Sequence, residues 1–150
     1  MKSIEFLKNN GIGFKVIHLK EVPKSAQDVE RLFGCSLHQV LKTLVFVGEK
    51  EPLVVVLPGD EKAGIEKLRQ ISGQKSLRMA KPDEVERITG YSVGGVCPFA
   101  IENHLKKIID KSVFDIDTVN IGSGKAEIGI ELKSADLRRI WDGAIDDISE

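Results

Sequence analysis

The fold of this chain is decided by two apolar runs, Thr43-Leu44-Val45-Phe46-Val47 and Leu53-Val54-Val55-Val56-Leu57. The segment between them, Gly48-Glu49-Lys50-Glu51-Pro52, is polar and is typical of a hairpin connection. Because both runs are almost continuously apolar and rich in β-branched residues, we expect two strands buried on both faces, in the centre of a sheet. Pro58-Gly59-Asp60 ends the second strand.

Further strands and helices are predicted on both sides of this pair. Strands are expected at 14–19, 76–80, 108–110, 113–114, 118–121, 127–132 and 144–148. Helices are expected at 3–9, 25–33, 63–71, 82–89 and 134–141, with a short turn at 36–40. Ser3, Ser25 and Ser134 are the predicted N-caps. Strands and helices do not alternate strictly, so we predict an α+β fold with a mixed sheet and flanking helices.

Length and charge limit the class of protein. A chain of 150 residues suits one domain, 1–150, with a real hydrophobic core. Its 22 Lys and Arg against 23 Asp and Glu give a net charge of −1, so no global basic field indicates binding to DNA or another duplex. A protein that binds only a short single-stranded end could still have this balance.

The cysteine count and the N-terminus indicate a cytoplasmic protein. Two cysteines, Cys35 and Cys97, do not make a disulfide framework. The first residues, 1–5, have no apolar signal region, and the chain has no run of eighteen apolar residues. We therefore expect no membrane interaction.

The most unusual stretch is Tyr91-Ser92-Val93-Gly94-Gly95-Val96-Cys97-Pro98-Phe99. Glycine allows positive φ and close approach of a ligand, while Pro98 stiffens the end of the stretch. One interpretation is a loop near the core that presents its amide groups to a ligand. The other is an ordinary buried turn.

Two further segments have a functional and a structural interpretation. Lys42 precedes the first apolar run; it is either a solvated residue at a strand edge or a cation in a cleft that binds phosphate or carboxylate. Gly122-Ser123-Gly124-Lys125 is either a tight hairpin turn or a small nest of amides near a polar ligand. It lacks the spacing of a Walker motif, which is excluded.

Cys97 and the histidines are weaker candidates. Cys97 is either a thiolate nucleophile or a small buried hydrophobic residue. His18, His38 and His104 lie far apart in the sequence, which argues against a zinc site built on histidines.

Four segments together resemble one family. They are Lys42-Thr43-Leu44, Val56-Leu57-Pro58-Gly59-Asp60, residues 89–98 with the string Thr-Gly-Tyr-x-Val-Gly-Gly-x-x-Pro, and Gly122-Ser123-Gly124. In this order they are similar to the YbaK-like family, the prolyl-tRNA synthetase-associated editing domains, over almost the whole chain. The string at 89–98 is highly specific, whereas Gly-Ser-Gly alone is weak.

The resemblance implies a free-standing trans-editing deacylase with a barrel-like mixed sheet and no metal or other cofactor. Such a protein hydrolyses the ester between a wrong amino acid and the 3′-terminal adenosine of a tRNA, commonly tRNA(Pro), so the expected partners are the tRNA acceptor end and prolyl-tRNA synthetase. The residues expected for catalysis are Lys42, Gly94 and Gly95. Those expected for substrate binding are Thr43, Pro58, Gly59, Val96, Cys97, Pro98, Gly122, Ser123 and Gly124.

This chain departs from the family pattern at three positions. Ala100 stands where many relatives have glycine, Gly129 where the subgroup that clears cysteine has an acidic residue, and Leu19 near a position where that subgroup has an aromatic residue. Alanine, cysteine, serine and threonine all stay open as the amino acid removed.

Two rival hypotheses remain beside the deacylase. The near-neutral charge and the missing subgroup residues suggest a non-catalytic module that binds aminoacyl-tRNA or a synthetase. A thiol enzyme built on Cys97 is the third possibility.

Overall fold

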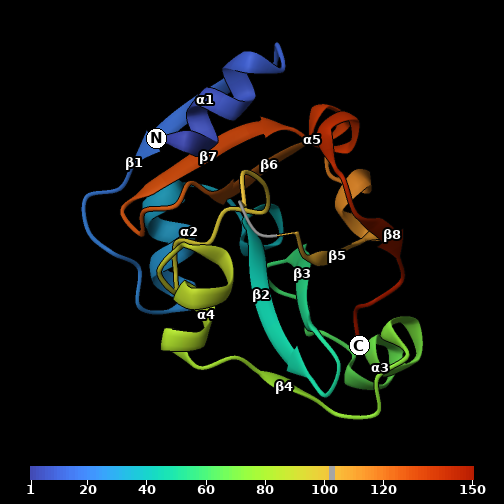
Figure 1. Cartoon of the computed structure of the whole chain (residues 1–150). Helices are drawn as coiled ribbons and strands as arrows, with labels where there is room; N and C mark the ends of the chain where they lie inside the picture. The colour runs from blue at the N-terminus through green and yellow to red at the C-terminus, as the bar shows by residue number, and fades with distance from the viewer. Residues whose placement is uncertain (102–103) are drawn as a thin grey trace.

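The two apolar runs form the centre of a five-stranded mixed sheet. A computed structural model describes residues 1–101 and 104–150 of the chain (Figure 1). The strand order is β4-β2-β3-β5-β8; the β2 pairs are antiparallel, and the pairs of β5 with β3 and β8 are parallel. The strands are β2 (Leu41–Gly48), β3 (Pro52–Pro58), β4 (Leu77–Met79), β5 (Lys106–Asp110) and β8 (Ala144–Asp146).

The prediction of full burial holds for β3 and only partly for β2. Residues 53–57 of β3 are inaccessible to solvent, because Val54 and Val56 pack into one core cluster while Leu53, Val55 and Leu57 pack into another. In β2, Val45 and Phe46 are buried, but residues 42–44 are only half-buried. These three residues face the cavity described below.

The remaining strands form a second, antiparallel sheet in the order β1-β7-β6. It consists of β1 (Phe14–His18), β6 (Thr118–Gly122) and β7 (Ile128–Lys133). An isolated parallel bridge between Val40 and Asn120 connects it to the five-stranded sheet, and the larger core cluster lies between the two sheets. The α+β class with a mixed sheet and flanking helices is confirmed, although the strands divide into two sheets that do not close into a barrel.

The helices flank the sheets. Figure 1 shows α1 along the β1–β7 side of the three-stranded sheet and α3 beside the C-terminus. The helices are α1 (Lys2–Asn9), α2 (Ala26–Phe33), α3 (Ile65–Ser72), α4 (Pro82–Thr89) and α5 (Ser134–Ile140), with 3-10 turns η1 (Leu37–Gln39) and η2 (Lys111–Asp115). Ser25 is the N-cap of α2, as predicted: its Oγ accepts the Asp28 amide at 3.1 Å. No helix among the described residues is long and apolar enough to cross a membrane.

Three sequence predictions are wrong in detail. Residues 113–114 belong to η2 and not to a strand, because Asp110 caps the turn by accepting the Ser112 amide. Ser3 lies inside α1, and its hydroxyl donates to the Ser123 carbonyl at 2.6 Å. Ser134 is the first residue of α5 and not its cap.

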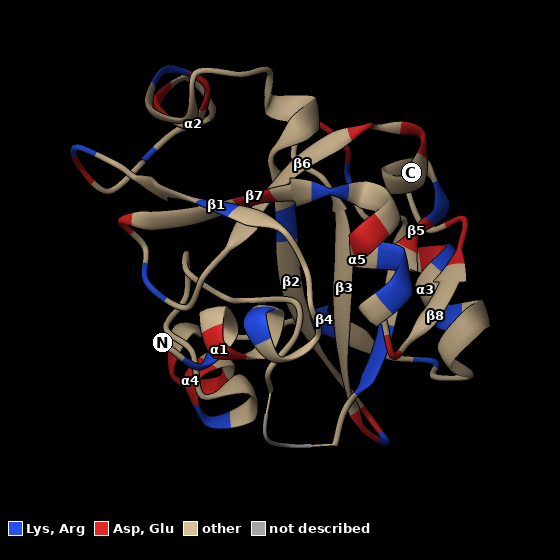
Figure 2. Cartoon of the chain, turned by 90° about the horizontal axis from the view of Figure 1, so that it is seen from above, with Lys and Arg blue, Asp and Glu red and all other residues tan. Residues whose placement is uncertain are grey.

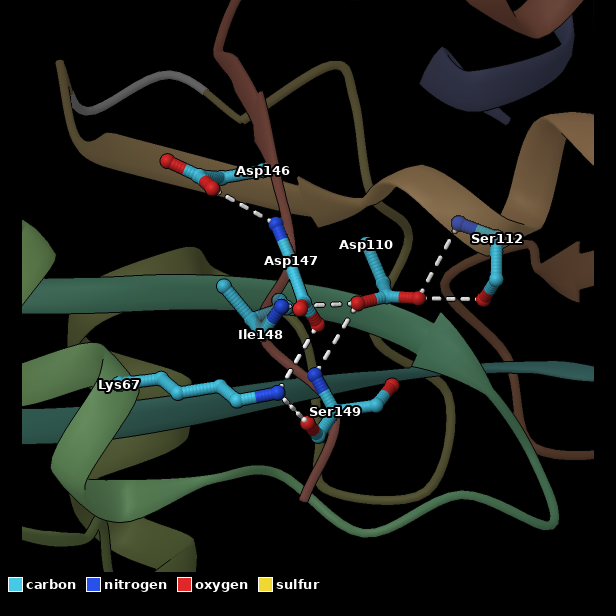
Figure 3. Close-up of polar contacts among 7 residues, drawn as sticks. All are labelled: Lys67, Asp110, Ser112, Asp146, Asp147, Ile148 and Ser149. Atoms are coloured by element: carbon cyan, nitrogen blue, oxygen red, sulfur yellow. Dashed lines mark hydrogen bonds and ion pairs between the residues drawn. The ribbon is translucent and has the colours of Figure 1, made fainter.

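The C-terminal residues are held by one buried carboxylate. Figure 3 shows Asp110, at the end of β5, between the chain after β8 and Ser112. Its Oδ1 accepts the amides of Ile148 at 2.8 Å and Ser149 at 3.0 Å, and its Oδ2 accepts the amide and the hydroxyl of Ser112. Burial raises the pKa of Asp110, but the hydrogen bonds outweigh burial, so the pKa lies below its usual value. This connection anchors Ile148 in the second core cluster.

Candidate active site

The candidate site is a cavity of about 630 Å³ between the two sheets' neighbouring ends and α2. Four segments converge on it: the start of β2, the loop at 93–96, the β6–β7 connection and the segment 22–37 that contains α2. Of the predicted site residues, Lys42, Thr43, Gly59, Gly94, Val96 and Gly122 line the cavity. Six of the twelve predicted site residues, far apart in the sequence, are therefore brought together.

Lys42 supplies a cation to this cavity. Within residues 1–101 and 104–150, its ammonium has no hydrogen bond or ion pair. Burial lowers the pKa of Lys42, while the carboxylates of Asp60 and Glu61 act in the opposite direction and Lys62 lowers it further. A half-buried ammonium without a direct partner is suited to bind an anionic or strongly polar group.

The loop at 93–96 faces the cavity with main-chain groups. Gly94 has a φ of +89°, which favours glycine, and the amides of Gly94 and Val96 donate no hydrogen bond to another described residue. The Gly95 amide instead donates to the Ser92 carbonyl at 3.1 Å, closing a turn. The predicted use of Gly95 as an amide donor therefore does not fit the structure. Gly94 and Val96 both line the cavity, and their amides have no hydrogen-bond partner among the described residues.

The loop lies very close to the β6–β7 connection. A methyl group at Gly122 would lie 2.4 Å from the Val96 carbonyl oxygen, and one at Gly95 would lie 3.0 Å from the Ala126 nitrogen. Both distances are too short for an unstrained side chain. The two glycines thus allow the contact that holds the loop in place.

Six predicted site residues do not line the cavity: Pro58, Gly95, Cys97, Pro98, Ser123 and Gly124. Each has a structural contact instead. The Pro98 carbonyl accepts Lys107 Nζ at 2.8 Å, and Ser123 Oγ donates to the Ile128 carbonyl at 2.6 Å. Cys97 is fully buried, and burial raises its pKa to about 12. A thiol that stays protonated and out of reach does not fit a nucleophile.

Lys107, which does not line the cavity, donates a hydrogen bond to Pro98, just after the loop at 93–96. It is 7% exposed, its Nζ lies 2.5 Å from an Asp142 carboxylate oxygen, and it sits 4.6 Å from the centre of the Trp141 ring. The sequence showed only a lysine at the start of a strand, so its contact with Pro98 was not predictable. This contact fixes the C-terminal end of the loop.

The wall of the cavity formed by α2 was not predicted. Val29 and Phe33 were expected only as part of a helix at 25–33, and no residue of α2 is fully buried. Both line the cavity, together with Val22, Pro23 and Ala26, and Lys125 adds a second cation. The spacing of four between Val29 and Phe33 indicates one apolar helix face, but it does not show whether that face packs on the core or lines a cavity.

One group of described residues offers three potential metal ligands. The ligand atoms of His38, Asp60 and Glu61 all lie within 4.8 Å of one another, and His38 Nδ1 lies 2.8 Å from Asp60 Oδ1. The group is partly exposed and stands beside Lys42, where its two carboxylates favour the charged ammonium.

Comparisons with known proteins agree with this geometry. The aminoacyl-tRNA editing domain model matches residues 20–140. The chain belongs to the aminoacyl-tRNA editing domain family. The predicted family is thus confirmed, and with it the enzyme class, aminoacyl-tRNA hydrolases, at the level of the family.

Two curated relatives and one solved structure illustrate the similarity of this editing domain. It is 29% identical over 142 residues to the multifunctional Ser/Thr-tRNA deacylase ProXp-y of Escherichia coli K12, covering 91% of this chain and 84% of that protein. It is 29% identical over 126 residues to EbsC of Enterococcus faecalis, named provisionally as a Cys-tRNA(Pro)/Cys-tRNA(Cys) deacylase, covering 83% and 77%.

The solved structure extends the likeness to the whole fold. A crystal structure described provisionally as a trans-editing enzyme for prolyl-tRNA synthetase superposes with a TM-score of 0.87 at 26% identity. The superposition covers 99% of the editing domain and 96% of that chain.

Proposed function

We propose that this editing domain, acting in trans over residues 1–150, hydrolyses the ester of tRNA(Pro) charged with a small wrong amino acid. The observation that carries the proposal is that Lys42, Gly94 and Val96 line one cavity, where the Lys42 ammonium and the two main-chain amides have no hydrogen-bond partner among the described residues. The likeness to EbsC and to the trans-editing enzyme structure supports tRNA(Pro) as substrate and prolyl-tRNA synthetase as a partner.

The reaction needs a placed water and stabilisation of an oxyanion. The water oxygen attacks the ester carbonyl carbon, and the carbonyl oxygen becomes negative. The bond from that carbon to the ribose oxygen then breaks, and the proton lost by the water ends on the ribose oxygen. The neighbouring ribose hydroxyl of the substrate can hold the water, so no protein nucleophile is required.

The amides of Gly94 and Val96 are the proposed oxyanion donors. One well-placed donor contributes roughly 3–4 kcal/mol to the stability of such a transition state. Gly95 and Gly122 act by allowing the loop to approach the β6–β7 connection, which fixes the direction of both amides. The site thus works through main-chain groups held in advance of the reaction.

Lys42 is proposed to bind the terminal nucleotide's phosphate and so orient the ester toward the amides. Thr43 and Gly59 border the same part of the cavity. A short single-stranded acceptor end also fits the charge distribution, since Figure 2 shows Lys and Arg next to Asp and Glu on helices such as α1, α2, α4 and α5. This distribution offers no broad basic face for a long duplex.

The test is deacylation of tRNA(Pro) charged with alanine, cysteine, serine or threonine, by wild type and two variants. Lys42→Ala is expected to lose at least a hundredfold in kcat/KM for every substrate that the wild type hydrolyses, while its thermal unfolding stays unchanged. Lys15→Ala, an exposed lysine on β1, is the matched control and should behave as wild type. Undiminished turnover by Lys42→Ala contradicts its role. Binding of charged tRNA without any hydrolysis by wild type selects the non-catalytic module instead.

A further inference from the structure

We propose that Phe33, packed over Gly129, is the specificity-determining wall of the acyl pocket and restricts the enzyme to small, apolar aminoacyl groups. The proposal rests on the deacylase function given above and names its substrate class. It is carried by the contact between this ring and a strand glycine at the edge of the cavity.

The Phe33 ring lies directly on the main chain of β7. A methyl group at Gly129 would lie 2.4 Å from Phe33 Cε1 and 2.8 Å from its Cζ. Real side chains do not approach so closely, so the ring occupies the space that any side chain at 129 would need. Neither an acid nor a hydroxyl can stand there while the ring keeps its place.

This ring stands beside the proposed oxyanion donors. Gly129 pairs directly with Gly122 across the β6–β7 ladder, and the side-chain directions of such a pair share one face about 4.5–5.5 Å apart. From Gly122 that direction leads to the Val96 carbonyl oxygen, and from Gly129 it leads to Phe33. The ring and the loop are therefore neighbours over the same pair of glycines.

The position of the ring decides which part of the substrate meets it. If the ester carbonyl oxygen is held by the amides of Gly94 and Val96, the Cβ atom of the amino acid lies three bonds from that oxygen. The Phe33 ring lines the cavity on the same face of the β6–β7 ladder, so we infer that this Cβ meets the ring. Its neighbours in the segment 22–37 that line the cavity are apolar as well: Val22, Pro23, Ala26, Val29 and Leu37.

An apolar wall of this kind discriminates in two ways. One additional methylene that does not fit lowers kcat/KM by roughly 10- to 200-fold. A hydroxyl group placed against the wall finds no hydrogen-bond partner from Phe33 or Val29 and loses its hydration. We therefore expect alanine to be removed faster than serine and faster than valine.

The experiment uses the full chain and acceptor-stem RNAs charged with Ala, Ser or Val. For wild type, kcat/KM for Ala should exceed the value for Ser, and that for Val, at least tenfold. Phe33→Ala should raise the Val-to-Ala ratio at least tenfold. Leu32→Ala is the matched control, because it truncates a residue of the same helix that does not line the cavity; its ratios should stay within twofold of wild type.

Other outcomes contradict the proposed role of Phe33. Equal kcat/KM values for Ser and Ala show that the pocket does not select against a hydroxyl group. A uniform loss for all three substrates in Phe33→Ala means that the ring stacks on the terminal adenine and not on the acyl group. Gly129→Ala is a second variant: it pushes the ring toward the cavity and should lower the Val-to-Ala ratio further.

Failure of the proposed deacylase function can be distinguished from failure of the proposed role of Phe33. If wild type hydrolyses none of these three substrates and neither the Cys- nor the Thr-charged tRNA of the first test, the deacylase proposal fails. Binding of 3′-aminoacylamino-adenosine analogues, whose amide link resists hydrolysis, then tests the wall alone. Tighter binding of the Ala analogue than of the Ser and Val analogues supports the role of Phe33 as the specificity-determining wall. Kd values that do not depend on the acyl group contradict this role.

Discussion

Replacing Asp110 with alanine is expected to destabilise the protein by about 3 kcal/mol. The wild-type carboxylate accepts the amides of Ile148, Ser149 and Ser112 while only 2% of the Asp110 residue is exposed. A hydrogen bond to a charged acceptor contributes about 1.5–3 kcal/mol, and the two amides of the C-terminal segment therefore lose roughly 3–6 kcal/mol. Release of that segment limits the loss, since its amides then bind water; it gives up the burial of Ile148, about 1.5–3 kcal/mol, and the main-chain hydrogen bonds of the segment to Lys62 and Gly64.

Urea unfolding of wild type, Asp110→Ala and Asp146→Ala measures this effect. Asp146 is an exposed carboxylate that accepts only its neighbour's amide among the described contacts, so its variant is the matched control and should lose under about 0.5 kcal/mol. The pKa of Asp110 is lowered in the folded protein, so its contribution is present above its unfolded pKa of about 3.9 and disappears as the pH falls through the folded value. The difference between wild type and Asp110→Ala should therefore shrink below about pH 4. A loss under about 1 kcal/mol at pH 7, or a loss independent of pH, would refute the reasoning.

Three further variants test the loop at 93–100. Ala100 has a φ of +55°, a strained conformation for an L residue, so Ala100→Gly should raise the free energy of unfolding by about 0.5–1 kcal/mol in urea titration; a decrease contradicts the strain. Lys107→Met keeps the buried stem but removes the donor to the Pro98 carbonyl. It should lower the free energy of unfolding by about 2 kcal/mol, and it should reduce kcat by a larger factor than it changes KM. An unchanged kcat shows that the loop keeps its shape without this hydrogen bond. Cys97→Ala should deacylate within twofold of wild type, since burial raises the thiol pKa to about 12, and a hundredfold loss would restore the thiol mechanism.

Much of the fold was predictable because its signals are local. The apolar run at 53–57 identified a central strand, and Ser25 and Gly34 marked both ends of α2. The prediction of a strand at 113–114 was wrong. The two apolar residues are locally typical of a strand, whereas the side chain of Asp110 before them caps the turn η2. A capping contact of this kind can override intrinsic propensity.

The site was predictable as a set of segments and less so as a set of groups. The resemblance of four motifs to one family singled out Lys42 and Gly94, and both line the cavity. No sequence pattern shows which amide forms the hydrogen bond of a turn. Gly95 was expected to be a donor to the ligand, whereas among the described residues it is the Val96 amide that has no partner. The contact of Phe33 with Gly129 joins segments far apart in the sequence, and a missing Cβ at 129 gives no sign of the ring that covers it.

The anchoring of Ile148 by Asp110 has a consequence for folding during synthesis. The paired strands β2 and β3 leave the ribosome early, but β5 lacks its parallel neighbour β8 and the second core lacks Ile148 until residues 144–148 have emerged. Pairing between such distant segments is slow, because the loop between them must close first. Until then β5 is an open edge that can pair with another chain. We therefore expect the nascent protein to reach its full resistance to proteolysis only after residue 148 has cleared the exit tunnel.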